Sequence, residues 1–209
     1  MYKTVVILAM MLLMPLYGTE ACAKRPVHDR VLTARQAFAL IPTEIFENTG
    51  FPLSEEEKVH LAEQGLSFHW SITEDEPDLL RFRSADGSDA VYLRLFRSSR
   101  GAVAAFRTED DGGVCLSELW FISKGGHAAP LPLPPEPDTD DFFTPGRELP
   151  GRLTSSCTYC VFDRGLEVLP SFSSDGIPCD LEPDNAFYYL WNGHRFVKKI
   201  KKIPLPSGQ

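Results

Sequence analysis

The sequence predicts an α+β fold in which one or two N-terminal helices pack on an antiparallel β-meander, followed by a C-terminal β-hairpin. Three observations predict it. Helix-start signals precede residue 65, apolar residues alternate with polar ones from residue 66 onward, and an Asn-Gly pair separates two aromatic-rich runs near the C-terminus. The first pattern is typical of amphipathic helices, and the second is typical of strands with one solvated face.

Two segments before residue 65 have the pattern of short helices. Thr33 with Gln36 three residues later forms a capping box, and the apolar positions that follow share one face until Pro42 interrupts them. Ser54 precedes three glutamates, which favour the positive end of a helix dipole, and Gly65 is a typical helix end. The expected buried stripe of the second helix consists of Val59, Leu61 and Ala62.

From residue 66 the apolar period changes from helical to two. Leu66, Phe68 and Trp70 are separated by single polar residues, which predicts a strand with one solvated face. Four more strand candidates follow, at residues 80–82, 90–96, 102–107 and 114–122. Because short turns separate them, we expect these five strands to form an antiparallel meander whose apolar face the helices cover.

Residues 124–150 interrupt the strand pattern. They contain a Gly-Gly pair, a proline-dense run and then several acidic residues. Proline at this density cannot join a ladder and favours extended polyproline conformations. We interpret the stretch as a Pro-rich acidic surface excursion within a single domain at 24–209. Two domains are the alternative, although the residues after the stretch would make a small independent core.

The last part of the chain contains further strands and a hairpin. Residues 155–163 and 166–172 are strand candidates, and Asn192-Gly193 then separates two aromatic-rich runs. Asn-Gly at this position is a strong hairpin signal because both turn residues need a positive φ. The run from Leu190 to Val197 also resembles a tail of exported bacterial proteins, in which an aromatic residue and Asn-Gly or Asp-Gly precede a final Phe. The resemblance implies a periplasmic setting and no particular chemistry.

The N-terminus has the three parts of a cleavable secretory signal peptide: Lys3, an apolar run at 5–16 and an Ala-Cys-Ala ending. The apolar run is shorter than the roughly 20 residues that a membrane span needs. We therefore expect removal of residues 1–23 near Ala23, a periplasmic or secreted product, and no transmembrane segment in the mature chain. Acylation of Cys22 as a lipid anchor is the alternative, but the residues before it fit such a site poorly.

Charge and motifs exclude several functions. The net charge of −8 repels phosphate backbones, so nucleic acid is not an expected partner. The sequence contains no phosphate loop, dinucleotide fingerprint, nucleophile elbow or metalloprotease helix motif, and its five histidines share no metal-binding spacing. We therefore predict no catalytic residue, no metal site and no cofactor.

Four cysteines remain after signal cleavage: Cys115, Cys157, Cys160 and Cys179. An even number in an oxidising compartment predicts structural disulfides, and three connectivities are possible. If Cys115 and Cys179 bond to Cys157 and Cys160 in either pairing, the final segment is linked to the meander.

A thiol-disulfide exchange site at Cys157-x-x-Cys160 is the alternative interpretation of this pair. Such a site needs its first cysteine at a helix N-terminus, where the dipole lowers the thiol pKa. The residues that follow, Val161 and Phe162, favour a strand instead. The primary functional prediction is thus a non-catalytic exported protein, whose aromatic-rich sheet binds an unknown small ligand or a protein partner.

Overall fold

The fold is that of a computed structural model, and the structure describes residues 31–46, 52–109 and 115–204. The predicted signal peptide lies outside the described residues, so it stays a prediction. From Leu32 onward the chain forms one compact unit.

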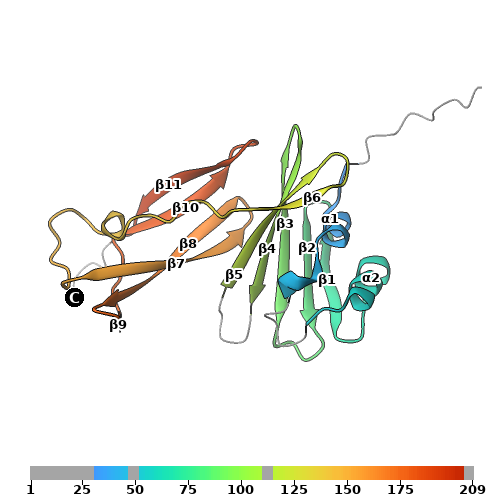
Figure 1. The fold of residues 1–209 in the computed structure, drawn as a ribbon, viewed down its shortest axis with the longest axis horizontal. Helices are drawn as coiled ribbons and strands as arrows, with labels where there is room; N and C mark the ends of the chain where they lie inside the picture. The colour runs from blue at the N-terminus through green and yellow to red at the C-terminus, as the bar shows by residue number, and fades with distance from the viewer. Residues whose placement is uncertain (1–30, 47–51, 110–114, 205–209) are drawn as a thin grey trace, which may run out of the picture. The chain divides into compact units, whose positions relative to one another are not determined.

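The described residues form two short α-helices, two 3₁₀ turns and eleven strands (Figure 1). The helical elements are α1 (Ala34–Leu40), η1 (Thr43–Phe46), α2 (Glu55–Gln64) and η2 (Thr139–Phe142). The strands are β1 (Trp70–Glu76), β2 (Leu79–Ser84), β3 (Ala90–Ser98), β4 (Gly101–Glu109), β5 (Cys115–Ser123), β6 (Ala128–Leu131), β7 (Leu153–Phe162), β8 (Gly165–Ser174), β9 (Ile177–Cys179), β10 (Asn185–Trp191) and β11 (Phe196–Lys202).

The strands form two antiparallel sheets. The first sheet has the order β1-β2-β3-β4-β5-β6, so each strand pairs with its neighbours in the sequence. The second sheet has the order β11-β10-β8-β7, with β9 paired beside β8. The prediction of a helix-containing, mainly antiparallel fold is therefore confirmed at this coarse level, but there are two sheets where the sequence predicted one meander and an added hairpin.

The two helices and η1 cover one face of the first sheet. The predicted capping box at the start of α1 is present, with reciprocal bonds between Thr33 and Gln36. Phe38 and Phe46 pack against Phe82 of β2, with ring centroids 5.1 and 6.0 Å apart respectively. This first core is closed to solvent, because all three of these rings are fully buried.

Helix α2 begins and ends where the sequence predicts but buries a different stripe. Ser54 caps its start, and Gly65 ends it in the left-handed region. Leu61 is fully buried as expected, whereas Val59 is 48% exposed and Lys58 is buried in its place. The stripe prediction was therefore wrong at Val59.

The first strand also begins later than its alternating pattern predicts. Leu66 and Phe68 are 61% and 84% exposed, and β1 starts only at Trp70. The chain turns between them, because the backbone N–H of Ser67 donates to the carbonyl of Trp70 at 2.8 Å. The alternation of apolar and polar residues therefore starts at Leu66, four residues before the strand itself.

The second face of the first sheet is buried in part by the second sheet. On β4, Ala102 and Ala104 face the first core, while Val103 and Ala105 belong to a second core. This second core includes Val161 of β7 and several aromatic side chains of the second sheet. A run that is apolar at consecutive positions, as in β4, is typical of a strand buried on both faces.

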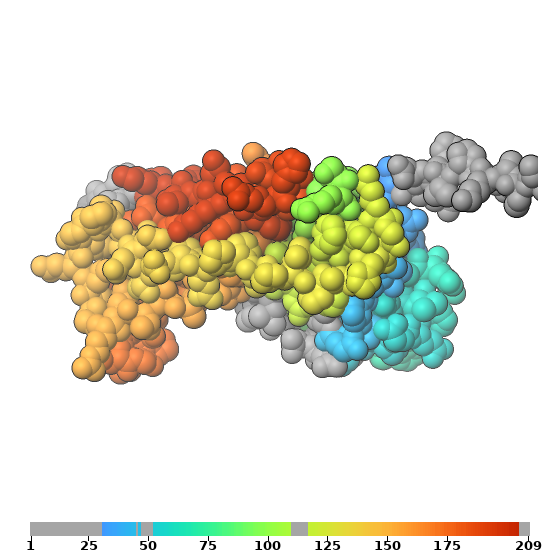
Figure 2. All heavy atoms as spheres, turned by 45° about the horizontal axis from the view of Figure 1, so that its top comes forward, coloured from blue at the N-terminus to red at the C-terminus, as the bar shows by residue number. Residues whose placement is uncertain are grey.

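Residues 131–137, here called the strap, run from β6 along the second sheet (Figure 2). The hydroxyl of Tyr159 donates to the carbonyl of Pro134 at 2.7 Å, and that of Tyr189 donates to the carbonyl of Pro135. Beyond the strap, Phe142 and Phe143 are buried in the second core. The 124–150 stretch therefore contributes a strand and core residues, which the expected surface excursion did not include.

The close approach of β8 to β10 yields a test of this arrangement. Gly165 pairs with Leu190, and a Cβ atom on Gly165 would collide with the backbone carbonyl of Tyr189. We expect Gly165→Ala to lower the free energy of unfolding by about 1–3 kcal/mol, measured by denaturant titration. Gly151→Ala is the matched control, because nothing lies within 4 Å of a Cβ there. Equal stability of the two variants would contradict the described packing of β8 on β10.

Candidate functional site: a hollow between the two sheets

An open hollow of about 500 Å³ lies where the first sheet meets the β10–β11 hairpin and the start of the strap. Its volume falls within the range of small-molecule sites, which is roughly 300–1,000 Å³. The apolar part of its wall consists of Val103, Leu119, Phe121, Leu131, Trp191 and Phe196. The hollow therefore offers mainly aliphatic and aromatic contact surface.

Strand register places the first half of this wall. Val103 of β4 is the cross-strand partner of Phe121 of β5, and Leu119 lies two residues from Phe121. Directly paired residues and residues two apart share a face, so these three side chains point to the same side of the first sheet. Leu131 of β6 is paired with Leu119 and extends that face.

The hairpin turn at Asn192-Gly193 places the other half. Gly193 has the expected positive φ, but Asn192 does not, and the turn spans residues 192–195, so the prediction of a two-residue turn was wrong. Trp191 and Phe196 are cross-strand partners on either side of the turn, and their rings lie 5.1 Å apart. The Asn192 side chain accepts the backbone N–H groups of His194 and Arg195, which holds the turn closed. The aromatic pair is thereby fixed at the end of the hairpin that faces the hollow.

Trp191 fastens the hairpin to the first sheet. Its indole Nε1 donates to the backbone carbonyl of Arg97 at 2.9 Å, and its ring lies 6.0 Å from that of Phe96. Two further bonds join the sheets: Tyr92 donates to Asp163, and the Arg107 guanidinium donates to the carbonyl of Val161. The two walls of the hollow are thus linked by direct hydrogen bonds.

Polar lining residues of the hollow are Ser98, Arg100, His194 and Arg195. Arg100, His194 and Arg195 are exposed, and none of the described lining residues is Asp or Glu. Among the described residues, no carboxylate lies within ion-pair distance of Arg100 or Arg195. The polar part of the site is therefore cationic, in a chain whose net charge is −8.

The predicted cysteine sites fall elsewhere, on the second sheet. Cys157 and Cys160 both lie inside β7, three residues apart. Residues at this spacing in a strand point to opposite faces and are separated by roughly 10 Å, beyond the reach of a disulfide. The two cysteines therefore do not form the close pair that a thiol-disulfide exchange site needs.

Cys157 and Cys179 are free thiols, which corrects the expectation that both take part in disulfides. Cys157 is paired with Pro170 and Cys179 with Phe172, from opposite sides of β8. Two strands that flank a third are about 9–10 Å apart, too far for a bond between them. Cys160 is disulfide-bonded. The side chain of Cys115 lies outside the described ones, so the expected disulfide at Cys115 stays a prediction.

The environment of Cys157 suppresses its nucleophilic form. Burial raises the pKa of the thiol from its ordinary value to about 11, and the charge and hydrogen bond of the Glu136 carboxylate act in the same direction. A nucleophilic cysteine needs the opposite, a lowered pKa that yields thiolate at neutral pH. Cys157 is therefore protonated at neutral pH.

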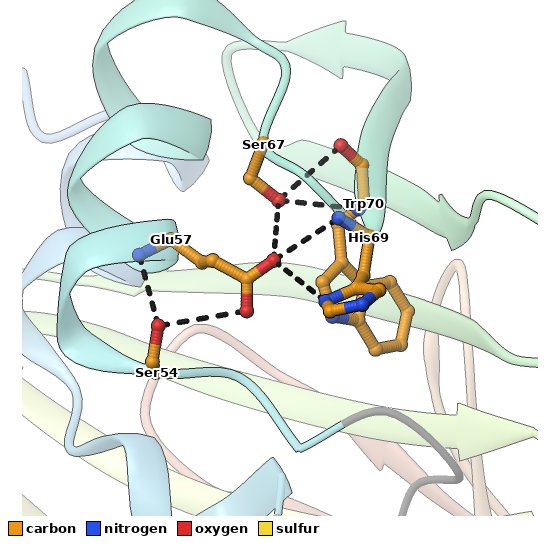
Figure 3. A network of polar contacts seen from close by, with 5 residues as sticks. All are labelled: Ser54, Glu57, Ser67, His69 and Trp70. Atoms are coloured by element: carbon orange, nitrogen blue, oxygen red, sulfur yellow. Dashed lines mark hydrogen bonds and ion pairs between the residues drawn. The ribbon is translucent and has the colours of Figure 1, made fainter.

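Glu57 collects several polar contacts near the start of β1 (Figure 3). Its Oε1 accepts the backbone N–H of His69 at 3.0 Å and lies 3.1 Å from His69 Nδ1. The hydroxyl of Ser67 bonds to Glu57 and to the carbonyl of Trp70. The network joins α2 to the segment that enters β1.

The described residues contain no cluster of three or more His, Cys, Asp or Glu side chains placed to hold a metal ion. None of the described helices has the length and apolar character required to cross a membrane.

Sequence reasoning predicted the hairpin but did not identify the hollow. The sequence predicted an aromatic-rich binding sheet in general terms, but nothing in it indicates that Trp191, Phe196, Arg100 and Arg195 line one site. The available signal is local: aromatic residues flank Asn192-Gly193 on both sides, next to His194 and Arg195. No such signal marks Ser98 and Arg100 at the β3–β4 turn, because their place in the lining depends on how the two sheets meet.

No protein-family profile matches this chain, and no curated protein matches it at a significant level. Among solved structures, it is similar to a domain of an uncharacterized protein from Porphyromonas gingivalis W83, with a TM-score of 0.48 and 16% sequence identity. The match covers 79% of this chain and 96% of that one.

The raised pKa of Cys157 predicts slow alkylation. At pH 7 iodoacetamide should modify this thiol slowly, with a rate that rises as the pH approaches 11, because only the thiolate reacts. Glu136→Gln removes the carboxylate's contribution and should shift the rate profile to lower pH. Peptide-level mass spectrometry measures both, and Glu148→Gln, an exposed change in the same part of the chain, is the control. Rapid modification at pH 7 would show that the thiol is activated after all.

Proposed function

We propose that this chain is an exported, non-catalytic domain that binds a small, largely apolar ligand in the hollow between its sheets. The observation that supports the proposal is the hollow itself, with its apolar wall and cationic rim. Ligand sites in proteins are commonly concave and mostly apolar, with a small number of polar groups that orient the ligand. We also propose that the predicted arrangement forms this site: the N-terminal helices pack on the meander, and the C-terminal hairpin supplies one wall of the hollow.

The thiol-disulfide exchange alternative has less support. A thioredoxin-type site depends on a paired thiol of low pKa at a helix N-terminus, whereas Cys157 lies within a strand and has a raised pKa. No contact of the described residues favours this function over binding. A protein partner in place of a small ligand is the other possibility that the proposal distinguishes by its test.

The apolar probe N-phenyl-1-naphthylamine tests the site without involving charge. We expect it to fluoresce on binding the wild-type protein and to lose roughly tenfold or more in affinity in Leu131→Trp, whose larger ring fills the hollow. Leu169→Trp is the matched control: this leucine on β8 is also half-exposed, at 43% against 36% for Leu131. Equal binding by both variants would contradict the proposal, provided that melting curves show both to be folded.

Export is part of the same proposal. We expect N-terminal sequencing of the mature protein, purified from the producing cell, to begin at Lys24, because Ala21 and Ala23 form a small-x-small site. A blocked N-terminus at Cys22 carrying acyl chains in its mass spectrum would establish the lipid-anchored alternative. A product that retains Met1 would contradict export through this segment.

A further inference from the structure

The rim of the hollow has an unusual charge arrangement for this chain. Six described arginines form ion pairs with carboxylates, namely Arg35, Arg94, Arg97, Arg107, Arg147 and Arg152. The other described arginines, Arg81, Arg83, Arg100, Arg164 and Arg195, have no such partner in the described part of the chain. Of these, Arg100 and Arg195 come from turns far apart in the sequence and line the same hollow. In a protein with 29 acidic and 21 basic residues, two unpaired guanidinium groups at one site form a local region of positive charge.

The apolar wall lies directly beside these charges. Phe121 and Phe196 line the same hollow as Arg100 and Arg195, and no acidic side chain does. A guanidinium offers planar, paired N–H donors that match a carboxylate, and its charge does not depend on pH in the physiological range. The chemistry that complements both features is a molecule with an apolar body and one carboxylate.

A second hollow on the other side of Trp191 has a different charge pattern. Asp163 lines it together with Arg164 and Lys199, so charges of both signs face the same space. Asp163 is also bonded to Tyr92 and paired with Arg94. That hollow has no preference for an anion, because charges of both signs line it. The rim that carries Arg100 and Arg195 is the better place for an anionic group.

We infer that the ligand of the hollow is a carboxylate amphiphile of fatty-acid type. Its alkyl chain packs against the apolar wall, and its carboxylate lies between the Arg100 and Arg195 guanidinium groups. The inference rests on the proposed function and specifies its ligand class. A protein partner would have to cover the surface around the hollow as well, because stable protein interfaces bury roughly 800 Å² on each partner.

Competition with N-phenyl-1-naphthylamine tests the inference, using decanoate, decanol and decylamine as probes with the same chain length. Decanoate should displace the dye at a roughly five- to tenfold lower concentration than decanol, because two charge-assisted contacts add to the apolar burial. Decylamine should displace it least. The variant Arg100→Gln/Arg195→Gln should raise the decanoate concentration required by a similar factor and leave decanol unchanged.

Arg81→Gln/Arg83→Gln is the charge-matched control, since both arginines lie on β2, away from the lining residues. The inference is wrong if decanoate and decanol compete equally, or if the Arg100/Arg195 variant changes the competition by neither compound. In that case, dye binding that is sensitive to Leu131→Trp still supports an apolar site. If the control variant weakens decanoate equally, the effect is one of net charge and the assignment of these two arginines is wrong. Loss of the dye signal's dependence on Leu131 would overturn the proposed function and this inference together.

Discussion

The structure depends on a first sheet that is apolar on both faces. Strands β3, β4 and β5 direct alternate side chains to opposite sides, and apolar residues occupy both sets of positions. Exposing either face to water would cost about 25 cal/mol for each Å² of apolar surface. Helices α1 and α2 cover one face, and the second sheet covers part of the other. Where that second cover ends near the β10–β11 turn, Phe121 and Leu131 remain partly accessible and form part of the wall of the hollow, whereas Val103 and Leu119 behind them are buried.

In the described part of the chain no α-helix covers the second sheet, and the strap and η2 pack on it instead. A polyproline segment has no internal hydrogen bonds, so its carbonyl groups are available to other donors. Tyr159 and Tyr189 supply those donors, since each hydroxyl bonds to a carbonyl of the strap. The strap then continues to Phe142, whose ring lies 4.8 Å from that of Phe187. Proline density therefore marks a covering segment here, although the same composition also occurs in solvated linkers.

The sequence predicted those parts of the fold that local chemistry determines. Thr33, Ser54 and Gly65 define helix ends through hydrogen bonds within a few residues. The sequence predicted where the hairpin turns but not the type of turn, because Asn192 acts through its side chain and only Gly193 has the expected positive φ. The alternation at Leu66 and Phe68 did not predict their exposure. There, the Glu57 carboxylate binds the backbone of His69 from another element and sets where β1 begins.

The site itself could not be predicted, because its walls come from different sheets. Periodicity identifies which residues of β4 face one side, but it does not say what covers that side. The same limit explains the cysteines: an even count in an exported chain favours pairing, yet pairing also requires Cα atoms within about 7 Å. Placement on opposite sides of β8 prevents this for Cys157 and Cys179, whatever the redox potential of the compartment.

Charge and geometry at the hollow are the basis on which we propose binding. A catalytic site needs a nucleophile or a base whose pKa its surroundings tune toward neutrality. The shift at Cys157 has the opposite direction, since burial and the Glu136 carboxylate both disfavour its thiolate. The hollow holds guanidinium groups instead, which neither donate nor accept protons at ordinary pH but attract anions. Groups of this kind orient a ligand without transforming it, and they lie where the apolar wall of the first sheet is left uncovered.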